Sequence, residues 1–403
     1  MKTSDVLRGL RQQEKKNSQF LHLTAYENQL SLTARSGLCS KLSERYFFGS
    51  GKDGVVDWDP FTCLGMDHVQ DLLDRAAEAF KGMMGCDGVN FSCLSGVHAM
   101  MCAILSVTDP GDNVMIVHHD DGGHFATKHI LERTGRKYCY APFDQESLTF
   151  KAEKLADIFK KNTCRAIYLD ISYPTAPVNV KAIREALGKE AIIIFDASHT
   201  LGLMMGGKFQ SPFSEGADIV CANTHKTLPG PQKGLIAFRK KFSLKINSTI
   251  SNGLVSSPHL HHLLALGITI LEMEEHGEKY AAAIVQNANF LGEALERLGY
   301  EVRKTPIGSY SESHQVHLFI EKSKGKKIYK RLVDNYISTN FDDRLGGRLF
   351  MRLGTQEITR RGMGAEEMKT IARFLDSSIK ESDVSGAVKR FNAKFKKVYY
   401  SFD

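Results

Sequence analysis

Short apolar segments without polar alternation recur in the middle of the chain, between residues 113 and 238. Strands that are covered on both faces are typically continuous apolar runs rich in β-branched residues, whereas half-exposed strands alternate. Helical segments such as AEKLADIFKK and VKAIREALG lie between several of these runs. The pattern therefore predicts an α/β fold with a mostly parallel sheet. The predicted strands are NVMIVHH, AIYLDI, AIIIFD, ADIVCA and GLIAF, and LERTGRK is a further predicted helix.

Helical patterns precede this region. Ser4 is a candidate N-cap for a polar N-terminal helix, and DHVQDLLDRAAEAFKG predicts an amphipathic helix that Asp67 caps and Gly82 ends.

Beyond residue 258 the pattern changes to a long helical region, the strand QVHLFIE, a helix, the strand RLFMRLG and a closing helix. We expect three parts: an N-terminal arm (1–60), a large α/β domain (61–255) and a smaller C-terminal α+β domain (256–403). Because no Pro- or Ser-rich linker separates the two domains, we expect a broad interface between them.

Composition narrows the class of protein. With 403 residues, 42% hydrophobic and 25% charged, the chain is typical of a soluble globular protein, which excludes a disordered, collagenous or coiled-coil chain. The net charge of +7 is spread along the chain rather than gathered in a basic stripe, so we expect no nucleic-acid partner. No apolar run is long enough to span a bilayer, and the eight cysteines form no C-x-x-C pair. These features predict a cytoplasmic protein that has no membrane partner.

Three segments place reactive side chains where the carboxyl ends of parallel strands open into loops, the usual ligand-binding edge of such sheets. Asp196 ends the buried run AIIIFD, and a carboxylate there needs a cation or hydrogen-bond donors. Lys226 follows the next run, where desolvation would let it form a Schiff base. Ser95 and Gly96 open an apolar helix whose free N–H groups suit a phosphate. Pyridoxal 5'-phosphate requires a lysine that anchors it, a carboxylate that pairs with its ring nitrogen, and a turn that binds its phosphate. These three segments could supply all of them.

The segments around these residues resemble those of a known family. FDASHTLGL and ANTHKTLPGPQKGLIAF are similar to the D-x-A-H and T-H-K-T-x-x-G-P-R-G-G segments of serine hydroxymethyltransferases, which belong to the fold-type-I pyridoxal-phosphate superfamily together with threonine aldolases and transaldolases. Further blocks follow the family's order from residue 24 to residue 363: TAYENQ (S-E-N), SERYFFG (A-E-G-Y), SGVHA (S-G-S-Q-A), DDGGHFAT (H-G-G-H-L-T), SSPHLHH (G-G-P-x-x-H) and MRLGTQEITRRGM (R-x-G-T-x-x-x-T-x-R-G).

The resemblance implies a role for each matching residue. Lys226 would hold the cofactor, Asp196 would pair with its ring nitrogen, and Arg352 would grip the substrate α-carboxylate. Glu27 would exchange a proton with the substrate hydroxyl, and Tyr46 would reach the site of the neighbouring subunit in a homodimer with shared active sites. His124 is a further candidate catalytic residue. The implied cofactor contacts are Ser95, Gly96, Val97, Asp121, Thr175, Asp196, His199, Thr224, His225, Lys226, Ser256 and Ser257.

The chain departs from the family pattern at several of these positions. Asp121 stands where the family has a ring-stacking histidine, and an aspartate offers no aromatic face, so His124 or His119 would have to substitute. Val97 and Gln232 replace a phosphate-binding serine and an arginine. The insertion GSGKDGVVDWDPFTCLG and the short segment NFDDRLGGRLF interrupt two regions that bind folate in the family, which argues against tetrahydrofolate as a cosubstrate.

These features predict an enzyme that cleaves or forms the Cα–Cβ bond of a β-hydroxy-α-amino acid, L-threonine or L-serine. The glycyl carbanion would then add to another aldehyde, as in a transaldolase, or be protonated, as in an aldolase. The alternatives are a folate-dependent serine hydroxymethyltransferase, other chemistry on the same cofactor (racemisation, transamination or elimination) and a non-catalytic regulator. A metal site in HHDDGGH is disfavoured, because adjacent ligands on one turn rarely converge.

Overall fold

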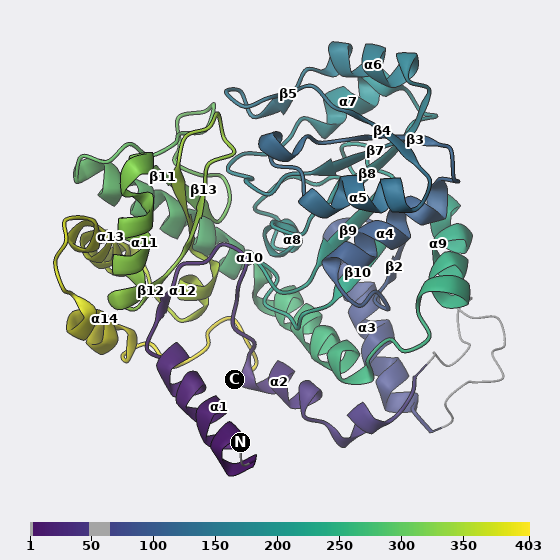
Figure 1. Ribbon diagram of the computed structural model, residues 1–403. Coiled ribbons are helices and arrows are strands. Elements are labelled where there is room, and N and C mark those ends of the chain that lie inside the picture. Colours follow the sequence, from purple (N-terminus) through teal and green to yellow (C-terminus); the bar gives the residue numbers. More distant parts are fainter. Residues whose placement is uncertain (1–2, 48–64) are drawn as a thin grey trace.

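The central sheet has seven strands, in the order β2-β10-β9-β8-β7-β3-β4 (Figure 1). The computed structural model describes residues 3–47 and 65–403. The strands β4, β3, β7, β8 and β9 run parallel, while β10 pairs antiparallel with β9 and β2. The mostly parallel α/β sheet is thus confirmed. The strand bounds are β2 Gly88–Asn90, β3 Asn113–Ile116, β4 Lys137–Tyr140, β7 Cys164–Asp170, β8 Ile192–Asp196, β9 Ile219–Asn223 and β10 Gly234–Phe238.

Helices cover both faces of this sheet, which explains why its strands are continuously apolar. Successive strand residues point to opposite faces, so Ile193 and Phe195 enter one hydrophobic cluster and Ile192 and Ile194 the other. The second cluster contains α4 Gly96–Val107, α5 Phe125–Arg133 and α9 Ser243–Thr249. The first contains α3 Asp67–Met84, α6 Ala152–Lys161, α7 Val180–Leu187, α8 Leu201–Met205 and the start of α10 Leu260–Arg297.

The C-terminal part has its own sheet and its own core. Its strands lie in the order β11-β14-β13 and are antiparallel. The long helix α10 continues from the first cluster into this core, so one helix belongs to both (Figure 1). The remaining elements are β11 Gln315–Phe319, α11 Gly325–Asp334, β12 Ile337–Ser338, β13 Asn340–Asp342, β14 Phe350–Gly354, α12 Gln356–Arg360, α13 Ala365–Ile379 and α14 Ser385–Asn392.

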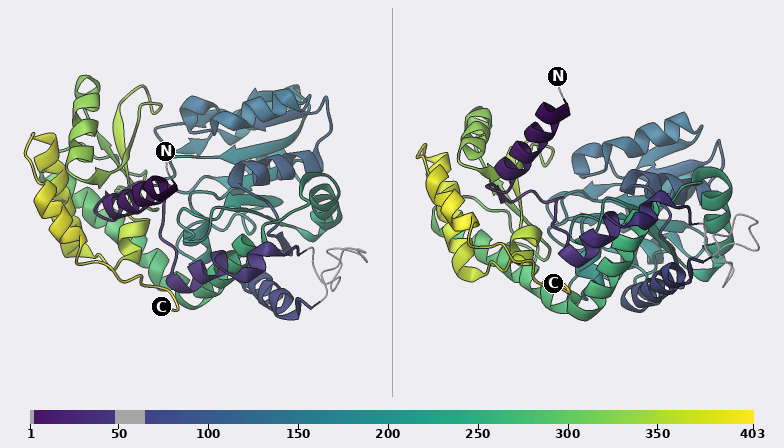
Figure 2. Two further views of the ribbon diagram at one scale, coloured as in Figure 1. Left: turned by 60° about the horizontal axis from the view of Figure 1, so that its bottom comes forward. Right: turned by 90° about the horizontal axis from the view of Figure 1, so that it is seen from below.

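The N-terminal arm packs on the C-terminal core before it crosses to the large sheet. The strand β1 Leu21–His22 pairs in parallel with β12, and Leu21 and Leu23 are buried in the C-terminal core. The helix α1 Thr3–Asn17 has no buried residue and extends away from the body of the molecule (Figure 2). The arm also contains α2 Leu32–Leu38, and β5 Phe143–Asp144 and β6 Thr149–Phe150 form a hairpin beside the large sheet.

Short helical turns complete the described chain. They are 3₁₀ turns at Lys41–Glu44, His119–Asp121, Lys240–Phe242 and Lys322–Lys324 and a π turn at Ile250–Leu254. None of the helices within residues 3–47 and 65–403 combines the length and apolarity needed to cross a membrane. The insertion GSGKDGVVDWDPFTCLG lies, except for its last residue Gly65, outside the described residues.

Four predicted helix boundaries were wrong. The helix α3 continues through Gly82 and ends at Met84, because Gly85 adopts the left-handed conformation (φ 65°) that closes a helix end. Its N-cap is Met66 and not Asp67, and no side chain caps it. Ser4 lies inside α1. The segment LERTGRK is helical only to Arg133, after which the chain turns and enters β4 at Lys137.

A buried ion pair fixes the arm against α10. Arg360 and Glu272 have no side-chain exposure and are 2.9 Å apart. Arg360 also donates to the carbonyl oxygens of Gln29 in the arm and Tyr400 near the C-terminus, both at 2.9 Å. Gln356, one turn earlier, donates to the carbonyl of Glu27 at 2.7 Å. The arm backbone next to the sheet is therefore anchored from two sides.

We predict that Glu272→Ala lowers the free energy of unfolding by about 3–5 kcal/mol, because it leaves the Arg360 guanidinium buried without its carboxylate. Urea unfolding followed by circular dichroism measures the change. As a matched control on the same helix, Glu278→Ala removes only an exposed pair with Lys208 and should unfold at the urea concentration of the parent. Equal effects of the two substitutions would contradict the stabilising role of the buried pair between Arg360 and Glu272.

Candidate active site

Polar side chains gather at the carboxyl edge of the large sheet. The parallel strands β7, β8 and β9 end at Asp170, Asp196 and Asn223, and Asp170 and Asp196 are paired in register. His199 follows β8 and Lys226 follows β9. The sheet topology therefore brings together the two residues that the sequence placed at strand ends, Asp196 and Lys226.

The Lys226 amine contacts His199. The Lys226 Nζ lies 3.0 Å from His199 Nε2. When the Asn223 amide is oriented so that its nitrogen donates to the Ser198 carbonyl (3.3 Å), its oxygen accepts from Lys226 Nζ at 3.1 Å. Asn28 in the arm donates to the Lys226 carbonyl at 2.6 Å. The lysine is thus held at both its backbone and its amine.

A closed turn follows β9 and presents Lys226. Thr224 Oγ1 donates to the Pro231 carbonyl at 2.5 Å, and Gly230 N donates to the Thr224 carbonyl at 2.9 Å. Thr227 Oγ1 donates to the His199 carbonyl at 2.8 Å, which joins this turn to the loop after β8. The adjacent His225 has a partly buried ring whose Nδ1 has no partner among the described residues.

Burial makes the lysine a nucleophile near neutral pH. Desolvation lowers the pKa of Lys226 to about 8, with Asp196 opposing this shift and Arg352 adding to it. Desolvation and the neighbouring Lys226 also hold the pKa of His199 well below its ordinary value, so its ring is neutral. A neutral amine is the form that attacks a carbonyl group.

Hydrogen bonds hold both oxygens of the Asp196 carboxylate. The hydroxyl of the buried Tyr168 donates to Asp196 Oδ2, and Ser198 N donates to Oδ1 at 2.7 Å. Tyr168 was missed in the sequence, because it reads as one more apolar residue of AIYLDI. Its position two residues before Asp170 puts it on the face of the sheet that also carries Asp196, which is the signal that could have found it.

Asp170 is a second buried carboxyl group that the sequence analysis missed. It is 4% exposed, and desolvation raises the pKa of its carboxyl well above the ordinary value, with Asp196 adding to the shift. Its Oδ2 accepts from His124 N at 2.8 Å and from Thr127 Oγ1 at 3.0 Å, while its Oδ1 has no partner. Asp170 therefore holds the start of α5, including His124, beside Asp196.

His124 lies close enough to Asp196 and Lys226 for their charges to act on its ring, whereas Asp121 is bound elsewhere. Burial lowers the pKa of His124, and Asp196, Lys226 and Arg344 are the charges that act on it most strongly. Its Nδ1 accepts from Ala126 N at 3.2 Å, so the ring carries its proton on Nε2. The Asp121 carboxylate instead accepts from Gln145 Nε2 at 2.8 Å.

The start of α4 lies against the end of β9. Ser95 is the N-cap, and its hydroxyl accepts from His98 N at 3.1 Å. The first N–H groups of the helix, which include those of Gly96 and Val97, have no acceptor within the helix. A Cβ at Gly96 would lie 2.8 Å from the Cβ of Asn223, so only glycine allows this approach.

Arg352 is a buried cation without an ion pair. It is 6% exposed, and no carboxylate among the described residues lies within ion-pair distance of it. Its Nη1 donates to the Ser172 carbonyl at 3.0 Å, and its guanidinium lies over the rings of Tyr26 and Tyr173 at 5.3 and 5.5 Å. A guanidinium in this state suits a planar carboxylate ligand.

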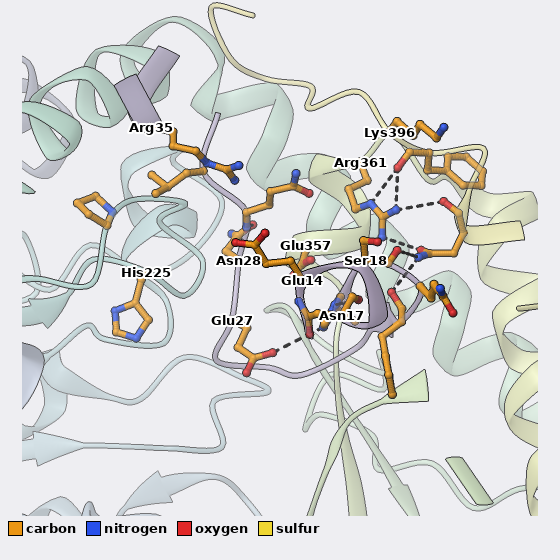
Figure 3. A pocket seen from close by; sticks show the side chains of 18 of the residues that line it. Glu14, Asn17, Ser18, Glu27, Asn28, Arg35, His225, Glu357, Arg361 and Lys396 are labelled. Atoms are coloured by element: carbon orange, nitrogen blue, oxygen red, sulfur yellow. Dashed lines mark hydrogen bonds and ion pairs between the residues drawn. The ribbon is translucent and has the colours of Figure 1, made fainter. Parts of the chain in front are cut away.

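Four predicted site residues are exposed or only partly buried in the single chain. Tyr46 is 61% exposed, Ser256 is exposed and Ser257 half-buried. The side chain of Glu27 is 50% exposed and lies 3.9 Å from His22 Nδ1. Glu27 lines a cleft of about 1220 Å³ together with His225, Gln232 and residues of α1 (Figure 3).

The residues at the sheet edge fit pyridoxal phosphate. The Lys226 amine matches the aldehyde of the cofactor, and the Asp196 carboxylate matches its ring nitrogen. The start of α4 matches its phosphate. Buried polar atoms without partners lie in the same region, among them Thr175 Oγ1, His225 Nδ1 and Asp170 Oδ1. No group of three or more His, Cys, Asp or Glu side chains in the described part of the chain is arranged to hold a metal ion.

Comparison with known proteins agrees with this chemistry. The family model of serine hydroxymethyltransferase matches residues 1–375. The chain is 33% identical over 401 residues to the serine hydroxymethyltransferase of Methanocella arvoryzae, covering 95% of this chain and 92% of that protein. It is also 33% identical over 378 residues to the fluorothreonine transaldolase of Streptantibioticus cattleyicolor, covering 92% of this chain but only 59% of that longer protein.

A solved structure has the same fold. The L-threonine transaldolase of Pseudomonas fluorescens superimposes with a TM-score of 0.92 and 30% sequence identity, over 99% of this chain and 93% of that one. The fold is therefore that of the fold-type-I pyridoxal-phosphate enzymes. Hydroxymethyltransferases and transaldolases are similar to this chain to the same degree.

We predict that Gly96→Ala weakens the binding of pyridoxal phosphate about tenfold or more, because the added methyl group pushes the start of α4 away from β9 at a cost of about 1–3 kcal/mol. Equilibrium dialysis of the cofactor measures the effect. Gly82→Ala, on a helix position with open space around it, is the matched control and should bind as the parent does. Unchanged affinity in Gly96→Ala would contradict the placement of the phosphate.

Proposed function

This chain belongs to the serine hydroxymethyltransferase family, and from that premise we propose that it is a folate-independent transaldolase. It would cleave the Cα–Cβ bond of a β-hydroxy-α-amino acid, L-threonine or L-serine, and join the resulting glycyl group to another aldehyde. Simple aldolase turnover, in which the glycyl group is protonated, would accompany this reaction when no acceptor aldehyde is present.

The environment of Arg352 is the observation that supports an amino acid as the substrate. Its guanidinium is buried, has no ion pair among the described residues and lies close enough to Lys226 to lower the pKa of the amine. A buried cation without a counterion is costly, and the α-carboxylate of an amino acid would supply the missing charge. The amino group of the same substrate would then lie toward Lys226.

The segment before β14 supports an aldehyde rather than folate as the second substrate. Arg344 pairs with Asp342 at 2.7 Å, and Tyr173 donates to the same carboxylate at 2.8 Å. The Arg344 Nη1 also reaches the His119 ring at 3.0 Å. This bridge joins the C-terminal sheet to the turn after β3, near His124, and a bridge in that place favours a compact second substrate.

The chemistry divides between the cofactor and the chain. Pyridoxal phosphate, when bound, supplies a ring that accepts the electron pair released at the substrate α-carbon. Asp196, fixed by Tyr168 and Ser198, would keep the ring nitrogen protonated. We assign Glu27 to exchange a proton with the substrate hydroxyl. His124 has its proton on Nε2 and would donate a hydrogen bond to the same substrate hydroxyl, from the side opposite Glu27.

A homodimer would complete the site. The helix α1 has no buried residue although Val6, Leu7 and Leu10 are apolar, and Tyr46 is 61% exposed. A second copy of the chain would cover both surfaces and bring Tyr46 to the neighbouring site.

The folate-dependent hydroxymethyltransferase is the second candidate, because relatives of that kind are equally similar to this chain. We expect the purified enzyme to convert L-threonine and an added aldehyde into a new β-hydroxy-α-amino acid without folate, as identified by mass spectrometry of the products. Folate-dependent formation of glycine from L-serine, with no product from threonine and aldehydes, would select the hydroxymethyltransferase instead.

We predict that Arg352→Ala raises the KM for the amino acid about 10–100-fold with a smaller change in kcat, since a hydrogen-bonded charge pair contributes about 1.5–3 kcal/mol. Steady-state kinetics with threonine measure both constants. The control Arg348→Ala removes an exposed arginine on the same hairpin, paired with Glu301, and should leave KM unchanged. An unaltered KM in Arg352→Ala would refute its role.

Lys226→Ala should abolish turnover and the covalent capture of the cofactor. Borohydride reduction followed by peptide mass spectrometry should find pyridoxal phosphate on Lys226 in the parent and on no residue in the variant. Cofactor fixed to another lysine of the parent would overturn the assignment.

A further inference from the structure

A buried side-chain network joins the C-terminal sheet to the lysine. Gln315 and His317 on β11 and His199 after β8 are all buried. Gln315 Nε2 lies 3.2 Å from His199 Nδ1, and His317 Nε2 lies 3.1 Å from Gln315 Oε1. The run QVHLFIE predicts a strand, and nothing in its pattern marks Gln315 or His317 as part of a site.

Backbone carbonyls fix the orientation of the Gln315 amide. Its Nε2 donates to the Ser172 carbonyl at 3.1 Å, and a carbonyl can only accept. The nearby His314 Nε2 donates to the Ala25 carbonyl at 3.0 Å and so has no lone pair to offer Gln315. The second Nε2 proton of Gln315 therefore goes to His199 Nδ1.

This orientation decides the tautomer of His199. A ring nitrogen that accepts a hydrogen bond carries no proton, so the neutral His199 ring has its proton on Nε2. That proton points at Lys226 Nζ, 3.0 Å away. A neutral amine can accept it with its lone pair while donating to Asn223, whereas an ammonium group would face another donor.

We propose that Gln315 is a positioning residue that keeps Lys226 in its neutral, reactive form by fixing His199 as the Nε2–H tautomer. The inference rests on the proposed role of Lys226, and it adds a residue of the C-terminal sheet to the control of that lysine. Without the Gln315 donor, the His199 ring could place its proton on Nδ1 and offer the Nε2 lone pair to the ammonium form.

The charged groups around Lys226 and His199 are the same in the parent and in the Gln315→Leu variant. Asp196 and Arg352 act on Lys226, and Arg352, His314 and His124 act on His199 beside Lys226 itself. On the far side of Gln315, His317 faces Arg303, Arg352 and Asp342. A shift in the titration of Lys226 that follows substitution of Gln315 is therefore assigned to the loss of its hydrogen bond.

The experiment measures how the reactivity of Lys226 depends on pH in the full-length chain freed of cofactor. One arm follows the rate of capture of added pyridoxal phosphate by absorbance. The other labels the amine with cyanate and quantifies Lys226 by peptide mass spectrometry, so it reports even if the cofactor assignment fails. Failure to capture cofactor in the parent would refute the proposed function, whereas the cyanate midpoint tests the role of Gln315 alone.

In the parent we expect the rate to rise with pH through a midpoint near 8, because the amine loses its proton there. Gln315→Leu should move the midpoint up by about one unit and slow both reactions about tenfold at pH 7. Gln315→Glu, which has nearly the same shape, should move it at least as far, because a carboxylate accepts from His199 Nδ1. Val316→Ala, the control on the same strand, removes only apolar contacts in the C-terminal core and should leave the midpoint unchanged.

Two further measurements separate a tautomer effect from a change in folding. In a His199→Phe background, Gln315→Leu should no longer move the midpoint. Nitrogen NMR of histidine-labelled parent protein, assigned with His199→Phe, should show His199 protonated at Nε2 and unprotonated at Nδ1. A proton on Nδ1, an unchanged midpoint in both Gln315 variants, or an equal shift in Val316→Ala would overturn the proposal.

Discussion

The candidate site depends on one constraint, which is that a lysine amine must lose its proton easily while a carboxylate stays close to it. Burial lowers the pKa of Lys226 to about 8, and Asp196 opposes that shift. The balance is maintained by neutral groups. Tyr168 and Ser198 hold the Asp196 carboxylate, and the His199 ring meets the amine. Hydrogen bonds of fixed direction can thus control protonation without adding charge.

The fold supplies the rigidity that this arrangement needs. Three adjacent parallel strands end at one edge, so Asp170, Asp196 and Asn223 are placed by backbone pairing rather than by flexible loops. The arm contributes Asn28 to the lysine backbone, and the ion pair between Arg360 and Glu272 anchors that arm on α10. Elements from the arm, the large sheet and the C-terminal sheet therefore meet around a single lysine and its histidine neighbour.

Membership of the family settles the cofactor class and leaves the second substrate to the surroundings of the site. Hydroxymethyltransferases and transaldolases are equally similar to this chain, so overall identity does not separate them. The groups around the lysine serve either reaction, because both begin by releasing an electron pair at the same carbon. Under the function proposed above, the acceptor would be distinguished near Arg344, which joins the C-terminal part of the chain to His119.

Local sequence patterns were enough to predict the sheet, its mostly parallel order and the strand-end residues Asp196 and Lys226, because buried strands leave apolar runs along the chain. The same patterns placed the end of α3 at Gly82, which was wrong. Only the backbone conformation reveals that Gly85 is the left-handed residue that ends the helix. Tertiary structure alone decided which polar residues inside apolar strands face the site. Tyr168 and Gln315 became visible only when strands distant in sequence met, because hydrogen bonds between separate elements leave no periodic trace along the chain.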